Sequence, residues 1–409
     1  MKKIKVIIST FGPLHLTKSA EFLSGLIDVS IIQAWLPRWW NSWILTLASK
    51  KVGRDLHKTF RKRLPQSVPM KKNHSVSLPE FYLFGHKLFH IGSPTKYQIK
   101  AAKLYGLMSR KYIKDADVFH VRSGSGLAGA IETAHERGMK VIVDHSIAHP
   151  AFMDRQLRDE YKKNEAVFDL GMDNPFWKAV LSDCNKADKL LVNSQFVKDT
   201  FVAEGYDADK ISVILQGVRK DFFKLKQHYR QDKNETLKIL FTGGFGFRKG
   251  AEYLLKALCR LDEMCVNYTM TVVGDSSSGL PLYERYAPKH VTFINTVPQD
   301  ELKKYLSDSD VYLFPSLCEG CASSGMEAMA AGLPVIATAE SGLPITDGQS
   351  GMLVKSKNVE QIVKSLLFIK DNPDISKKIG EIASRVIADN YTWEKYAANV
   401  TELYKEVLK

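Results

Sequence analysis

The residues with the clearest chemical potential are two glutamates, Glu319 and Glu327, separated by seven residues. An apolar run before Glu319 ends in a Pro-Ser turn, and a helix is expected to begin near Ser323. A helix N-terminus offers free N–H groups and about half a positive charge, which suits a phosphate or a polar sugar. Because Glu327 lies about two helical turns beyond Glu319, the two carboxylates could bind two separate sets of ligand hydroxyls. The alternative is that Glu319 only caps the helix and Glu327 only faces solvent.

A glycine-rich turn with two cations is the second candidate for a binding site. It follows an expected strand over residues 237–242 and contains Gly243, Gly244, Arg248 and Lys249. Glycines let backbone amides approach a diphosphate closely, and a neighbouring cation neutralises negative charge on a leaving group. Taken alone, such a turn would also fit an ordinary tight connection before a helix.

Together these motifs resemble the retaining nucleotide-sugar glycosyltransferases of the GT-B fold, family 4, also called group 1. The pattern Pro-Ser…Glu-Gly…Glu-Ala-Met-Ala…Gly-Leu-Pro-Val-Ile over residues 315–336 is similar to the family's Glu-x7-Glu signature. Val273-Gly274-Asp275 and the segment 341–351 resemble further family positions in the same order. Family members usually have an arginine where this chain has Gly244. Either Arg248 replaces it from a different angle, or one phosphate contact is missing.

The resemblance implies that the donor is a nucleotide diphosphate sugar. Glu319 would then orient the donor sugar, Lys249 would stabilise the departing diphosphate, and Glu327 would bind the ribose hydroxyls. The expected catalytic residues are Glu319, Lys249 and His145. The expected donor-binding residues are Gly243, Gly244, Arg248, Lys249, Gly274, Glu319, Gly320, Cys321, Ala322, Ser323 and Glu327.

In the first half of the chain, His145, His149 and Gly12 are the expected site residues. Two expected strand ends, at residues 117–120 and 141–146, resemble the edge at which the family lines its acceptor side. The family's histidine near the reacting centre matches His145 best, with His149 as a rival. Gly12 follows the first strand and would contact the acceptor together with His149. The alternative for either histidine is a structural role in the core.

No metal site is expected, and no cofactor beyond the nucleotide sugar as co-substrate. Three Asp-x-Asp pairs occur, at positions 115/117, 207/209 and 308/310. Asp117 and Asp310 directly precede apolar strands, which is typical of ordinary strand-entry residues, and the resembled family transfers without a metal. Cys318 and Cys321 form a single Cys-x2-Cys with no second pair at zinc spacing.

Short apolar runs, each followed by a turn and a helical stretch, predict two doubly wound, Rossmann-like α/β domains that face a cleft. The expected strands are 5–9, 118–121, 141–143, 190–192 and 211–215 in the first half, and 237–242, 270–273, 291–294, 311–314 and 335–338 in the second. A polar stretch at residues 224–236 indicates a linker. We expect an acceptor-side domain at 1–218, a donor domain at 219–390, and a C-terminal helix at 391–409 that crosses back to the first domain.

The charge of the 409-residue chain is uneven. Its formal net charge is +13, and the whole excess arises in residues 1–100, which hold 17 basic and 4 acidic side chains. Within residues 31–72, Trp35, Trp39, Trp40 and Trp43 precede nine Lys or Arg, which predicts contact with an anionic membrane surface. The alternative is that these tryptophans pack into the core or an acceptor pocket. Nucleic acid is not expected as a partner, because no known nucleic-acid module is evident.

These features predict a metal-independent glycosyltransferase of the hexosyltransferase type, which uses a saccharide or lipid-linked saccharide acceptor in the synthesis of cell-envelope polysaccharide or glycolipid. Five cysteines and an apolar run too short for a signal peptide indicate a cytoplasmic protein, peripheral on the inner face of the membrane. The alternatives are a sugar-nucleotide epimerase or hydrolase on the same fold, and a non-catalytic membrane or nucleic-acid binding protein.

Overall fold

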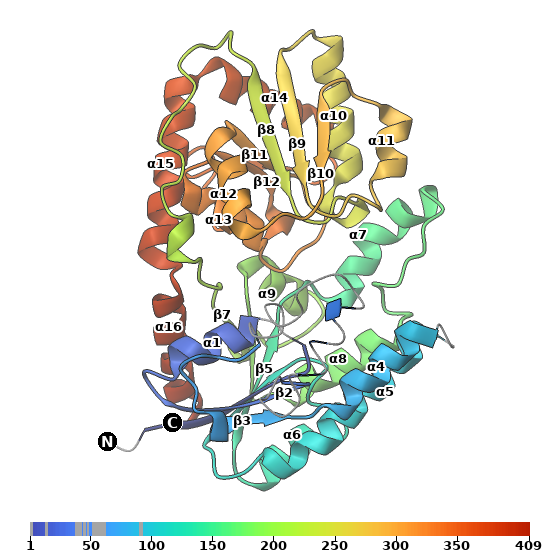
Figure 1. Ribbon diagram of the computed structural model, residues 1–409, viewed down its shortest axis with the longest axis vertical. Helices are drawn as coiled ribbons and strands as arrows, with labels where there is room; N and C mark the ends of the chain where they lie inside the picture. The colour runs from blue at the N-terminus through green and yellow to red at the C-terminus, as the bar shows by residue number, and fades with distance from the viewer. Residues whose placement is uncertain are drawn as a thin grey trace.

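The computed structural model describes residues 3–12, 15–36, 43, 46, 49–50, 63–89 and 93–409. Its two halves each contain a parallel sheet, one above the other in Figure 1. The first sheet has the order β3-β2-β1-β4-β5-β6-β7, and the second has the order β10-β9-β8-β11-β12-β13. This confirms the prediction of two Rossmann-like α/β domains. The strand order reverses between β1 and β4 and between β8 and β11, which is where doubly wound sheets bind ligands.

The strands lie where short apolar runs predicted them, with three additions. The first sheet comprises β1 Lys5–Thr10, β2 Asp28–Gln33, β3 Asn73–Ser75, β4 Val118–Arg122, β5 Lys140–His145, β6 Lys189–Val192 and β7 Ile211–Val213. The second comprises β8 Leu237–Thr242, β9 Tyr268–Val273, β10 Val291–Ile294, β11 Val311–Phe314, β12 Val335–Thr338 and β13 Met352–Val354. Strands β2, β3 and β13 were not predicted, because they are short or interrupted by polar residues. The predicted boundary at 218/219 falls between β7 and β8.

Helices connect the strands and cover both faces of each sheet. In the first half they are α1 His15–Leu23, α4 Leu78–Phe89, α5 Pro94–Ser109, α6 Ala130–Glu136, α7 Pro150–Lys163, α8 Pro175–Lys186 and α9 Gln195–Val202. In the second they are α10 Ala251–Glu263, α11 Leu280–Tyr286, α12 Gln299–Asp308, α13 Ser323–Ala331, α14 Val359–Asp371, α15 Pro373–Asn390 and α16 Trp393–Val407. Several begin with local signals that the sequence carries, such as proline in the first turn of α7, α8 and α15.

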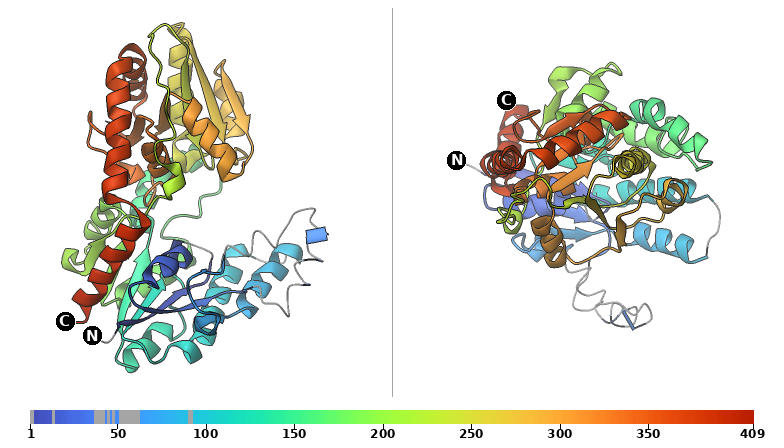
Figure 2. Two further views of the ribbon diagram at one scale, coloured as in Figure 1. Left: turned by 60° about the vertical axis from the view of Figure 1, so that its left-hand side comes forward. Right: turned by 90° about the horizontal axis from the view of Figure 1, so that it is seen from above.

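Helices α7 and α16 cross between the halves. Each packs against the opposite half of the molecule from the elements next to it in the chain. Helix α16 follows α15 down from the second half and packs beside α1 (Figure 2), where Trp393 and Tyr404 join the first half's hydrophobic cluster. Helix α7 comes from the first half, yet Met153 and Leu157 are fully buried in the cluster of the second half. The two halves are therefore joined by reciprocal helix packing as well as by the chain crossings.

The structure corrects part of the predicted membrane segment 31–72. Ile31 and Ile32 are fully buried in β2, and Trp35 is only 7% exposed. Ile31 and Ile32 belong to the core because β2 lies between β1 and β3, and their side chains join two different hydrophobic clusters. Trp43 is exposed, whereas Trp39 and Trp40 lie outside the described residues. Within the described part of the chain, no helix has the length and apolarity needed to cross a bilayer.

Candidate active site

The glycine-rich turn after β8 is held against the ends of β9 and β11. Gly274 has φ +139°, and a Cβ there would lie 2.3 Å from the carbonyl oxygen of Gly243. Gly250 has φ +73°, and a Cβ there would lie 1.9 Å from the carbonyl oxygen of Pro315. Any side chain at these two positions would clash with backbone, so glycine is required for the strand ends to approach each other.

Two cations from this turn face Glu319. A short 3-10 turn, Phe247–Lys249, orients both: Arg248 Nη1 lies 2.7 Å from Glu319 Oε1, and Lys249 Nζ lies 3.6 Å from the same oxygen. Arg248 Nη1 also donates to the carbonyl oxygen of Cys318 at 2.7 Å. Burial lowers the pKa of Lys249, although Glu319 opposes this shift. Two cations against one carboxylate leave an excess positive charge that suits an anion.

The turn between β11 and α13 lies directly against the first half. A Cβ at Gly320 would lie 2.1 Å from the carbonyl oxygen of Ser146, and the Ser194 hydroxyl donates to the carbonyl oxygen of Gly320. Helix α13 begins at Ser323, as predicted, so its N-terminus opens at the boundary between the halves. The free amides of this helix end lie in the same turn as Glu319.

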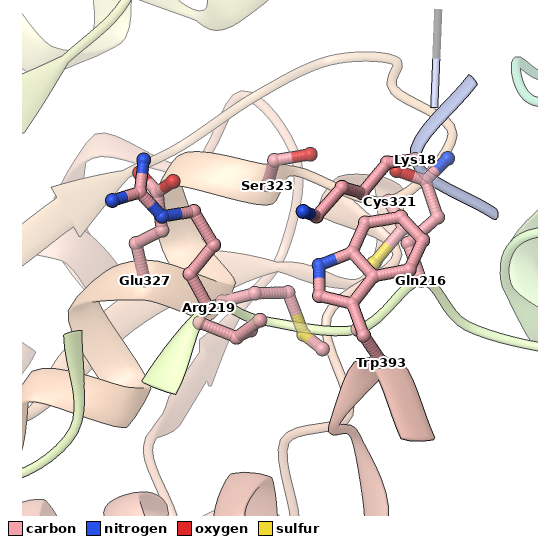
Figure 3. A pocket seen from close by; sticks show the side chains of 10 residues that line it. Lys18, Gln216, Arg219, Cys321, Ser323, Glu327 and Trp393 are labelled. Carbon is pink, nitrogen blue, oxygen red and sulfur yellow. The ribbon is translucent and has the colours of Figure 1, made fainter. Parts of the chain in front are cut away.

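A pocket of about 180 Å³ lies between the halves beside α13 (Figure 3). Ser323 and Glu327 line it from one face of α13, because residues four apart on a helix are neighbours. Figure 3 shows the Arg219 guanidinium beside Glu327 and the Lys18 side chain reaching towards Ser323. Burial raises the pKa of Glu327 to about 7, with Asp221 adding to the shift and Arg219 opposing it.

Seven residues that line this pocket were not predicted as site residues: Lys18, Gln216, Gly217, Val218, Arg219, Met326 and Trp393. Arg219 is the first residue after the predicted domain boundary at 218/219, and this position at the junction of the two domains could have drawn attention to it. Lys18 carries no local signal, because it reaches the pocket only through the packing of α1 on α16. Trp393 is the first residue of α16, and its ring stacks on Phe22 with centroids 5.9 Å apart.

His145 and His149 have different surroundings. His145 is 1% exposed, its Nδ1 lies 2.9 Å from Ser123 Oγ, and its Nε2 has no hydrogen-bond partner in the described structure. Burial lowers the pKa of His145 to about 3, so its ring is neutral at pH 7. His149 accepts a hydrogen bond from the amide of Ala151 and caps α7, while its ring packs edge-on against Phe201.

The structure brings His145 and Gly12 together but not His149. Both His145 and Gly12 line a second pocket, of about 380 Å³, at the carboxyl ends of β1, β4 and β5. We call this the strand-end pocket. It also contains Arg122 and Trp177, which the sequence did not single out. His149 does not line it, because its ring is already committed to the α7 cap and the packing on Phe201.

Asp117 and Asp310, from two of the Asp-x-Asp pairs, bind backbone amides in the structure. Asp117 accepts a hydrogen bond from the amide of Lys5 and Asp310 one from the amide of Lys238, which are contacts between neighbouring strands. Burial raises the pKa of Cys318 and Cys321 to about 12 each, so both are neutral thiols at pH 7. Across the described ranges, no group of three His, Cys, Asp or Glu is placed to hold a metal ion.

Comparison with known proteins places these features in a family. The model of glycosyl transferases group 1 matches residues 223–405, and that of glycosyltransferase family 4 matches residues 72–222.

The amylovoran biosynthesis glycosyltransferase AmsK of Erwinia amylovora is 30% identical over 300 residues, which cover 69% of this chain and 68% of that protein. A D-inositol 3-phosphate glycosyltransferase of Streptomyces bingchenggensis is 29% identical over 54% of each chain. A 41.2 kDa protein from the cps region of Klebsiella pneumoniae is 32% identical over 44% of this chain. The chain spans about half the length of the last two relatives.

Solved structures agree on the fold. A sucrose-phosphate synthase from Thermosynechococcus elongatus superposes with a TM-score of 0.71 at 15% identity, covering 99% of both chains. HepE from Anabaena, in complex with UDP and glucose, superposes with a TM-score of 0.62 at 12% identity, covering 98% of this chain and 99% of that one. The two family models follow each other along the chain, and the AmsK alignment spans both halves. The chain therefore belongs to the group 1 family of glycosyltransferases and has the GT-B fold.

Proposed function

We propose that the chain transfers a sugar from a nucleotide diphosphate sugar to a saccharide or lipid-linked saccharide acceptor, with retention of anomeric configuration. The observation that carries the proposal is the placement of Arg248 and Lys249 around Glu319, next to the glycine-rich turn and the N-terminus of α13. Preorganised cations and amides stabilise charge that grows on a departing diphosphate. The second half, residues 219–390, would hold the donor, and the first, residues 1–218, the acceptor.

In the proposed reaction, the bond between the sugar's anomeric carbon and the diphosphate oxygen breaks. The acceptor hydroxyl oxygen bonds to that carbon on the same face, its proton passes to the departing diphosphate, and the diphosphate keeps the bonding electrons. Lys249 stabilises the leaving group, and Glu319 orients the sugar. Glu327 accepts hydrogen bonds from the ribose, and the neutral His145 offers its Nε2 to the reacting sugar or the acceptor.

The cellular role proposed is the synthesis of cell-envelope polysaccharide or glycolipid. The support is that AmsK is described as an amylovoran biosynthesis enzyme and the Klebsiella relative as a protein of a cps region. We further propose that the enzyme works on the cytoplasmic face of the membrane and needs no metal ion. Transfer that persists in EDTA would support metal independence, and loss of activity restored by a divalent cation would contradict it.

A thermal-shift panel of UDP, GDP and ADP sugars tests the donor assignment. We expect one nucleotide series to raise the melting temperature, because a ligand that binds only the folded state stabilises it. UDP-glucose is the first compound to try, because the similar fold of HepE was solved in complex with it. NMR of the product then tests retention, since an α-linked donor must give an α-linked product. No shift with any nucleotide diphosphate would contradict the proposed function.

A further inference from the structure

The strand-end pocket has a polar floor at the end of the first sheet. Arg122 Nη1 lies 2.7 Å from Asp144 Oδ1, and His15 Nε2 lies 2.9 Å from the other carboxylate oxygen of Asp144. Asp144 is 4% exposed, so this carboxylate fixes the guanidinium firmly at the pocket. In the described structure, Nε and Nη2 of Arg122 and Nε2 of His145 have no protein partner. The floor therefore offers hydrogen bonds to a polar ligand.

The charges at this pocket are already balanced. Arg122 is paired with Asp144, and Glu80 at the wall lies 2.7 Å from Arg63. Glu80 also accepts a hydrogen bond from the amide of Trp35. A pocket whose charges are compensated favours a ligand end with many neutral hydroxyls over a free anion.

The walls are apolar and aromatic. Phe176 and Trp177 from α8 face the pocket together with Phe11 and Ile147. Trp177 Nε1 already donates to the carbonyl oxygen of Asp169, so the ring contributes an apolar face rather than a donor. Flat aromatic faces combined with a few fixed polar groups suit a sugar ring, which has apolar C–H faces and hydroxyl edges.

The apolar wall continues outside the pocket along α4. Glu80 and Leu83 of this helix line the pocket, and Phe84 lies next to Glu80 on the helix surface, four residues on. Phe84 is 64% exposed, Phe81 48% and Leu78 54%. These three residues are spaced at intervals of three, so they form one apolar ridge along the helix, next to Glu80 and Leu83 at the pocket.

We propose that the acceptor is a glycolipid, whose saccharide end occupies the strand-end pocket and whose hydrocarbon chain lies over the α4 ridge of Leu78, Phe81 and Phe84. This rests on the proposed function and commits it to a lipid-linked acceptor. Two features support this occupant: the ridge lies on the same helix as Glu80 and Leu83 of the pocket wall, and the first 100 residues carry the whole positive charge excess of the chain. That charge would bring the ridge to an anionic membrane, where such an acceptor resides.

Calorimetry with n-dodecyl β-D-maltoside, below its critical micelle concentration, tests the inference. Maltose, which has no hydrocarbon chain, is the control ligand. We expect the detergent to bind at least ten-fold more tightly than maltose. Ten-fold is about 1.4 kcal/mol, roughly what burial of two methylene groups provides. The double variant Phe81→Ser, Phe84→Ser should remove at least five-fold of the detergent affinity and leave maltose affinity unchanged. Both side chains are exposed, so the variant should fold.

The matched control is Phe368→Ser on α14, an exposed phenylalanine in the second half, which should not alter detergent binding. Equal affinities for detergent and maltose would overturn the inference. So would an equal loss in the control, or no loss in the double variant, because the ridge would then not be the site that binds the hydrocarbon chain.

Calorimetry of the wild type with UDP, GDP and ADP reports on the proposed function separately. If no nucleotide binds, the proposed function fails. If a nucleotide binds but the hydrocarbon chain of the detergent adds no affinity, only the glycolipid assignment fails.

Discussion

Arg248 and Lys249 are adjacent in the chain, but their surroundings separate their roles. The Arg248 guanidinium is engaged by the Glu319 carboxylate and by the Cys318 carbonyl. The Lys249 ammonium is farther from Glu319, and a Cβ on Gly243 would lie 3.0 Å from Nζ. Lys249 therefore reaches over the glycine-rich turn with more of its charge available to a ligand. Arg248 acts mainly by holding Glu319 in place.

We expect Lys249→Ala to lower kcat at least ten-fold, because loss of about 1.4 kcal/mol of transition-state stabilisation is a factor of ten. Single-turnover kinetics with the donor found in the thermal-shift panel would measure it. Lys364→Ala, an exposed lysine on α14, is the matched control and should retain full turnover. Wild-type turnover in a folded Lys249→Ala protein would remove Lys249 from the mechanism.

Glu327 should make nucleotide binding depend on pH. Burial raises its pKa to about 7, so the carboxylate that accepts ribose hydrogen bonds is progressively protonated below that pH. Hydrogen bonds to an ionised acceptor are roughly twice as strong as neutral ones. We expect affinity for the nucleoside diphosphate to fall several-fold from pH 8 to pH 6.

Calorimetry in matched buffers would measure this dependence, with Glu327→Gln as the control. The variant cannot ionise, so any pH dependence that remains in it belongs to the nucleotide's own phosphate. Identical pH profiles for the two proteins would show that Glu327 does not bind the nucleotide as a carboxylate.

At the scale of elements, helix α7 connects the two halves through a buried carboxylate. Glu160 is 5% exposed, accepts a hydrogen bond from the Tyr253 hydroxyl at 2.6 Å, and lies 2.9 Å from Lys357 Nζ and 2.6 Å from Lys163 Nζ. Tyr161, the next residue, packs on Phe247 of the turn that carries Arg248 and Lys249, with ring centroids 5.2 Å apart. The docking of α7 therefore also supports the candidate active site.

Glu160→Ala should lower the free energy of unfolding by about 1–3 kcal/mol, because it leaves buried polar partners unsatisfied. Burial alone would raise the pKa of Glu160, but Lys163, Tyr253 and Lys357 lower it overall. The stabilisation is therefore present above the unfolded-state pKa and is lost as the pH falls through the lower folded-state value. The difference from wild type should be full at pH 7 and shrink in acid.

Urea unfolding at several pH values would measure this difference. Asp159→Ala, which removes an exposed carboxylate from the same helix, is the control and should change stability little. A Glu160→Ala protein as stable as wild type at pH 7 would show that the carboxylate does not anchor α7.

For the whole molecule, the uneven charge predicts a salt-sensitive attraction to anionic membranes. The wild type should float with vesicles that contain phosphatidylglycerol and stay behind with pure phosphatidylcholine. The attraction should weaken in 1 M salt, where the screening length falls to about 3 Å. Replacement of Trp39 and Trp40 by serine should reduce flotation, since tryptophan favours the bilayer interface. If wild type does not float with anionic vesicles at low salt, the membrane prediction is wrong.

The sequence by itself determined most strands of the two sheets and the turns that end those strands. Strands β8, β10, β11 and β12 have the predicted bounds, and α13 begins at the predicted Ser323. These features follow from local apolar runs, turn residues and helix starts, which short stretches of sequence specify. The family resemblance also rested on such local motifs, and the comparisons confirmed that the chain belongs to the group 1 family.

Only the tertiary structure decided which side chains share a site. It placed Lys18 and Arg219 in one pocket with Glu327. It placed Arg122 and Trp177 in a second pocket with His145, and it committed His149 to the cap of α7. It also buried Ile31 and Ile32 in β2 and placed α7 on the second half. These outcomes depend on packing and desolvation between residues far apart in the chain. No local pattern encodes them, because a short segment of sequence is compatible with several surroundings, and only the assembled core selects one of them.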